Sequence, residues 1–173
     1  HAHAAAADWL ALAERAPSDD ARLAAMIEPI AHLAWDTVGA KRFPYAADVK
    51  PWDANAFLDA IESENEPAAI AHVRGALDGG VARGEIGRAL GRAALSHYAD
   101  FGHSAIYTHK SGQLIERLGR QSALPVMLAL VRSLVNATRE ERLPEFRGYD
   151  KARTAWDGAA TEPAQPQDFI GLS

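Results

Sequence analysis

The chain has 173 residues, of which 48% are hydrophobic and 24% charged, and chains of this length and composition typically fold as one globular domain. It contains no cysteine, which excludes disulfides, Cys-bound zinc, iron–sulfur clusters and thiol nucleophiles. Its 18 Lys and Arg against 23 Asp and Glu give a net charge of −5, so we expect neither nucleic acid nor a membrane as a partner. No signal-peptide pattern is visible, and we expect a cytoplasmic protein.

Alanine, leucine, arginine and glutamate dominate, and alternating runs of β-branched residues are missing, so the sequence predicts an all-α protein. Proline, glycine and capping residues divide it into about six helices, namely 4–15, 19–38 with a bend at Pro29, 53–62, 65–79, 83–120 with Gly102 and Gly112 as places to break, and 123–139. The apolar last helix should be central to one compact array over residues 1–156. Residues 157–173 should form an extended C-terminal arm on the surface or on a partner.

The most informative stretch, 95–109, carries four polar side chains at helical spacing: His97, Asp100, His103 and Tyr107. At about 100° per residue they fall within an arc of roughly 120° that also carries aliphatic residues, which predicts an inward face. Asp100 is three residues from each histidine and could fix the tautomer of either ring, leaving the other nitrogen as a base or metal ligand. The alternative is a hydrogen-bond network that only anchors the helix. A break at Gly102 would dissolve the common face.

A runner-up group, Glu28, His32 and Asp36, recurs every four residues, which suits a metal site or an acid–base pair. The aliphatic residues of the same predicted helix lie on its opposite side. Simple solvation of the three polar residues is therefore the favoured interpretation, and a bend at Pro29 would be needed to turn them inward.

Three glycines, Gly84, Gly87 and Gly91, line one stripe of the predicted helix 83–120. Each glycine costs about 0.8–1 kcal/mol in helix propensity relative to alanine, so a structural reason is expected. A close helix–helix contact is the favoured one, and a bed for a cofactor is the alternative.

From Ser96 to Thr108 the chain resembles the questin-oxidase-like family of helical oxygenases, whose inward helices carry a histidine, a few apolar residues, then histidine and glycine followed by an aromatic. About a dozen residues carry the resemblance, and the order here is Gly102-His103 rather than His-Gly. The resemblance implies oxygenation or oxidative cleavage of an aromatic polyketide-like substrate, with His97 and His103 as the matching positions. Members of that family are much longer, which implies a part or a reduced relative.

Two functions follow as hypotheses. The first is a ligand-binding or oxygenase-like domain for a small molecule, in which His97, Asp100, His103 and Tyr107 are catalytic and His97 and His103 could bind a transition metal. The second is a non-catalytic helical interaction domain that docks on a partner protein through the C-terminal arm and the glycine stripe. A homo-oligomer, or a larger protein of which this chain is a part, is compatible with both.

Overall fold

The computed structural model describes residues 1–38 and 43–155. These residues form eight α-helices and no strand beyond an isolated bridge between Ala99 and Arg139, which confirms the all-α class. The helices are α1 (Ala2–Glu14), α2 (Asp19–Thr37), α3 (Ala54–Glu62), α4 (Glu66–Asp78), α5 (Arg83–Leu95), α6 (His103–Leu118), α7 (Ala123–Val135) and α8 (Gly148–Ala155). The predicted C-terminal arm, 157–173, lies outside the described residues.

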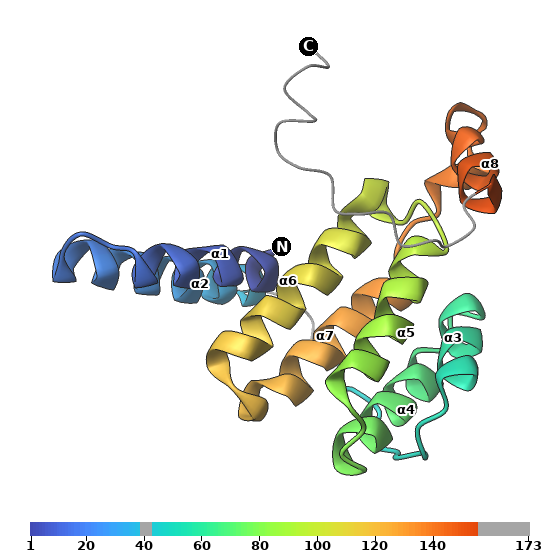
Figure 1. Ribbon diagram of the computed structural model, residues 1–173, viewed down its shortest axis with the longest axis horizontal. Helices are drawn as coiled ribbons and strands as arrows, with labels where there is room; N and C mark the ends of the chain where they lie inside the picture. The colour runs from blue at the N-terminus through green and yellow to red at the C-terminus, as the bar shows by residue number, and fades with distance from the viewer. Residues whose placement is uncertain (39–42, 156–173) are drawn as a thin grey trace.

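The apolar helix α7 occupies the centre of the body, as its sequence predicts. It packs against α4 and α6 and also meets α3 (Figure 1). Its buried side chains join a core whose largest fully buried members come from α3, α4, α5 and α7: Phe57, Ile70, Val73, Ile86 and Val131. The helix ends at Val135, four residues earlier than predicted, and short 3₁₀ turns and α8 follow it.

The predicted helix 83–120 is wrong as one element, because the chain turns sharply between Leu95 and His103. Asp100, Phe101 and Gly102 have φ angles of 50°, 52° and 86°. Three consecutive residues in the left-handed region cannot continue a right-handed helix. The structure therefore has two helices, α5 and α6, and the single inward face predicted across Gly102 does not exist.

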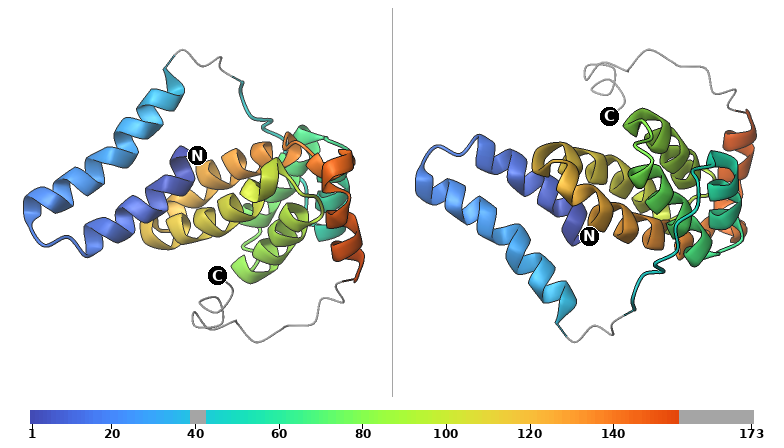
Figure 2. Two further views of the ribbon diagram at one scale, coloured as in Figure 1. Left: turned by 90° about the horizontal axis from the view of Figure 1, so that it is seen from above. Right: turned by 90° about the horizontal axis from the view of Figure 1, so that it is seen from below.

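Helices α1 and α2 form a hairpin that projects from the body (Figures 1 and 2). The hairpin is attached through α1, which packs against α6, while α2 packs extensively only against α1 among the described residues. Toward α1, α2 buries the small Ala25 and the ring of Pro29. Its large aliphatic side chains also point to solvent, contrary to the expectation of a covered apolar side, whereas Glu28 and Asp36 are exposed as the favoured interpretation predicts.

Candidate functional site

His97 lies in the connection between α5 and α6, where it is held between two carboxylates. Its Nδ1 is 2.6 Å from Glu141 Oε1 and its Nε2 is 2.7 Å from Glu62 Oε2. Glu62 ends α3, whereas Glu141 follows α7. The ring thus joins three parts of the chain that are distant in sequence.

Carboxylate oxygens lie at hydrogen-bond distance from both ring nitrogens of His97. The guanidinium of Arg139, 3.1 Å from Glu62 Oε1, brings a positive charge to the same network. Hydrogen bonding with His97 is the main cause that lowers the pKa of Glu62. Both ring nitrogens of His97 are thus occupied by carboxylates of this chain, which favours a structural role over the predicted role as a ligand or base.

The carboxylate of Asp100 does not contact either histidine, so its predicted orienting role is wrong. Its Oδ1 accepts hydrogen bonds from the backbone N–H of Thr138 at 2.9 Å and from the Thr138 hydroxyl at 2.8 Å. The buried Glu140 accepts from the backbone N–H of Phe101 at 3.1 Å. These bonds attach the left-handed turn to the chain that follows α7.

His103 and Tyr107 remain together on α6, as the sequence predicts, with ring centroids 5.7 Å apart. The ring of His1 packs edge-on against both, at 5.4 and 5.5 Å. The Nδ1 of His103 is 2.5 Å from the backbone carbonyl oxygen of Asp100. Since a carbonyl oxygen can only accept, Nδ1 carries the hydrogen, and in the neutral ring Nε2 is an acceptor. No hydrogen-bond partner of Nε2 is found among the described residues.

The electrostatics of Tyr107 complement this acceptor. Burial, and after it the negative charge of Asp100, raises the pKa of Tyr107 above its ordinary value of 10.0. Its phenol thus stays protonated near neutral pH and can donate a hydrogen bond. Asp100 hence contributes to this group through its backbone carbonyl and its charge, not through a carboxylate–histidine contact.

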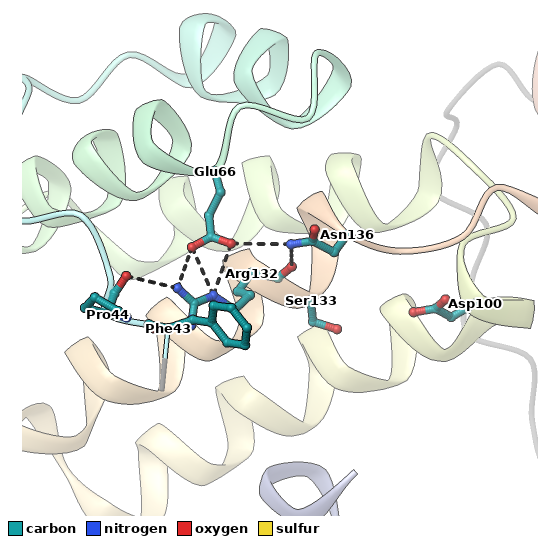
Figure 3. Close-up of a pocket in the computed structure, with 7 residues that line it drawn as sticks. All are labelled: Phe43, Pro44, Glu66, Asp100, Arg132, Ser133 and Asn136. Carbon is teal, nitrogen blue, oxygen red and sulfur yellow. Dashed lines mark hydrogen bonds and ion pairs between the residues drawn. The ribbon is translucent and has the colours of Figure 1, made fainter. Parts of the chain in front are cut away.

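An open hollow of about 650 Å³ lies between Arg132 and Asp100 (Figure 3). At one end Arg132 is fixed by Glu66, with Nη2 2.6 Å from Glu66 Oε1, and by the carbonyl of Phe43 at 2.7 Å. Asp100 lies at the other end, and Ser133 lies between them. Ser133 also lines a smaller cavity of about 100 Å³ that contains Tyr107. Ser133 is the one lining residue that the two spaces share.

A metal centre finds no support in this arrangement. Among residues 1–38 and 43–155 there is no group of three or more His, Asp or Glu side chains placed to hold a metal ion. The runner-up group is spread along α2, where His32 and Asp36 form an ion pair at 3.9 Å, with their side chains 39% and 46% exposed. Glu28 is exposed as well.

The glycine stripe does not serve a close helix contact, so that expectation is also wrong. An added Cβ would meet no atom within 4 Å at Gly87 or Gly91, and only Arg88 Nη1, at 3.6 Å, at Gly84. Gly84 and Gly87 instead border an open apolar groove of about 280 Å³ between α5 and α6.

Sequence reasoning missed five polar residues that build the network around His97 and Asp100: Glu62, Thr138, Arg139, Glu140 and Glu141. Glu62 and Glu141, which bond to His97, lie 35 and 44 positions away from it in the sequence, so no local spacing reveals them. The available signal was the pair Glu140-Glu141 directly after an apolar helix, a place where two adjacent carboxylates are costly unless hydrogen-bonded.

Comparisons of this chain with protein-family models, with curated proteins and with solved structures found no match. In the described part of the chain, no helix has both the length and the apolar character needed to cross a membrane.

Proposed function

We propose that this chain is a helical ligand-binding domain in which Tyr107, which lines the smaller cavity, and His103, packed beside Tyr107, contact a small molecule. The observation that carries the proposal is the hydrogen bond from His103 Nδ1 to the Asp100 carbonyl. It fixes the tautomer, so Nε2 is available to accept a hydrogen bond or a proton. The protonated phenol of Tyr107 supplies a donor next to it.

The surroundings favour an aromatic ligand that carries hydroxyl groups. Three aromatic rings, His1, His103 and Tyr107, pack edge-on or tilted beside the cavity and can stack with a flat molecule. Asp100 Oδ2 and Ser133 Oγ have no hydrogen-bond partner among the described residues and border the open hollow. The resemblance of 96–108 to the questin-oxidase-like family supports the same ligand class, and an oxygenase-like reaction of a cytoplasmic domain is the corresponding catalytic hypothesis.

In this proposal His97 is a structural residue. His103 is the base that would take a proton from a ligand hydroxyl, while Tyr107 would hold a ligand oxygen by donating to it. The alternative, an interaction domain, is favoured by a different feature, the exposed apolar side of α2.

The test uses 1,8-dihydroxyanthraquinone, a hydroxylated flat aromatic, as the probe in calorimetric titrations. Replacing Tyr107 by Phe removes one donor and should weaken binding about 3–10-fold, the equivalent of about 0.5–1.5 kcal/mol for a neutral hydrogen bond. His103→Phe should weaken it by a similar factor or more. His109→Phe is the matched control, because His109 lies on the same helix and is exposed. Equal affinity in all four proteins, or no binding by the wild type, would contradict the proposal.

A further inference from the structure

The side of α2 that faces away from α1 is apolar and exposed. We call it the α2 face, and it comprises six large side chains with the following exposed fractions: Leu23 58%, Met26 43%, Ile27 52%, Ile30 67%, Trp35 79% and Val38 78%. Taking about 200 Å² for a large side chain, these leave about 700 Å² of largely apolar surface in water. This exceeds the roughly 300–600 Å² of the largest patch on a typical monomer.

We propose that the α2 face is the interface of a homodimer, in which α2 of one copy packs antiparallel against α2 of a second copy. The exposed area is close to the roughly 800 Å² per partner that a standard stable interface buries. Each copy contributes an antiparallel hairpin of two helices, and two such hairpins together make a four-helix bundle. Because α2 packs extensively only against α1 in the described chain, the hairpin has room on its outer side.

The spacing of the α2 face fits a helix pair. Ile27 and Ala34 occupy a positions of a heptad, and Leu23 and Ile30 occupy its d positions, so these four residues form one stripe that faces away from Ala25 and Pro29. In an antiparallel pair, a and d positions alternate across the interface. Ile27 therefore meets the second copy's Ile30, and Leu23 meets its Ala34.

Charges select the antiparallel direction. The only charged side chain between Leu23 and Trp35 is Glu28, which lies at the margin of the α2 face. Parallel pairing would bring Asp19 and Asp20 next to their own copies, whereas antiparallel pairing places them at opposite ends of the interface. A second copy thus covers the apolar area without stacking these like charges.

The first experiment measures the mass of the full chain in solution by light scattering over a range of concentrations. The wild type should have twice the monomer mass, and Leu23→Glu should be a monomer, because a charge within the apolar interface would be desolvated. Leu95→Glu is the matched control: the same substitution at a leucine of α5 that is 46% exposed and should leave the dimer intact. Circular dichroism melts of both variants show whether each is folded. A monomeric wild type, or a dimer unaffected by Leu23→Glu, would overturn the proposal.

The second experiment tests the direction of pairing. The chain has no natural cysteine, so an introduced cysteine can form a disulfide only with its own copy in a second chain. In the antiparallel register, Ile27 lies beside the second copy's Ile27 next to the two-fold axis. Ile27→Cys should therefore form a disulfide-linked dimer under mild oxidation, since a disulfide needs Cα atoms about 4.4–6.8 Å apart. Ala34→Cys is the control, because residue 34 lies roughly 20 Å from its own copy at 1.5 Å per residue. Cross-linking of Ala34→Cys but not of Ile27→Cys would overturn the antiparallel interface.

Discussion

The two carboxylates that hold His97 should differ sharply in their contribution to stability. The Glu141 side chain is 3% exposed and accepts from His97 Nδ1 and, at 3.0 Å, from the backbone N–H of Tyr98. A hydrogen bond to a charged group contributes about 1.5–3 kcal/mol, so Glu141→Gln should cost about 2–3 kcal/mol. Glu62 is 58% exposed, and water screens its bond, so Glu62→Gln should cost about 0.2–1 kcal/mol. At about 2–4 °C per kcal/mol, Glu141→Gln should lower Tm by about 5–10 °C.

The same pair predicts that the free energy of unfolding depends on pH in the acid range. The pKa of Glu141 fixes the direction of this dependence. Burial alone would raise this pKa, but hydrogen bonds from backbone N–H groups and from His97 outweigh it, and the pKa lies below its ordinary value of 4.5. A lowered pKa in the folded state stabilises the protein above pH 4.5, and this contribution is lost as the pH falls through the folded value. Glu141→Gln should hence flatten the decline of the free energy of unfolding below pH 4.5.

Urea denaturation followed by circular dichroism, at pH 7 and at several values between pH 3 and 5, measures both effects. Equal losses of stability at pH 7 for Glu141→Gln and Glu62→Gln, or an unchanged decline below pH 4.5 in the Glu141 variant, would refute the different roles assigned to the two carboxylates.

Three glycines are predicted to serve different purposes, namely a close approach of the backbone, no required purpose, and a left-handed φ. Thermal melts of one alanine variant at each position test these predictions. Gly75→Ala should cost about 3 kcal/mol, since its Cβ would lie 1.7 Å from the carbonyl oxygen of Lys50 and backbone would have to move. Gly87→Ala should stabilise by about 0.5–1 kcal/mol, because no atom lies within 4 Å of its Cβ and alanine is the better helix former. Gly102→Ala should cost about 1–2 kcal/mol, because its φ of 86° strains any L side chain. A neutral Gly75→Ala, a destabilising Gly87→Ala or a neutral Gly102→Ala would each contradict the corresponding role.

The helix starts were predictable because their signals are local. Ser18, Asp53 and Asn65 cap α2, α3 and α4, and each accepts a hydrogen bond from a backbone N–H two or three residues ahead. The central position of α7 was predictable for a similar reason, since a helix that is apolar on nearly all sides must be buried. Composition and spacing within one helical turn contain this information.

The turn that separates α5 from α6 was not predictable from the same kind of pattern. Asp100 and Phe101 adopt left-handed angles that L residues rarely take, and distant groups stabilise them. Thr138 donates to the Asp100 side chain, and Glu140 accepts from the Phe101 backbone. A helical wheel drawn across 97–107 assumes a continuous helix, and that assumption fails where tertiary contacts cover the cost of a strained turn.

The expectation that the apolar side of α2 is covered failed for another reason. The spacing of apolar residues gives the direction of the apolar side of a helix, but it does not tell what covers that side. Packing against α1 uses Ala25 and Pro29, whose small or flat side chains let the two helices approach closely. The larger Ile27 and Ile30 are left for another surface.

The left-handed turn also explains why one predicted cluster became two groups with different chemistry. On the His97 side of the turn, Glu62 and Glu141 occupy both ring nitrogens, so the histidine contributes to stability. On the other side, the turn directs the Asp100 carbonyl toward His103 Nδ1, which leaves the Nε2 of that ring without a partner in the described chain. A backbone carbonyl keeps this role when the Asp100 carboxylate is changed. Asp100→Asn should therefore preserve the His103 tautomer, and loss of the tautomer should instead follow from substitutions that straighten the turn.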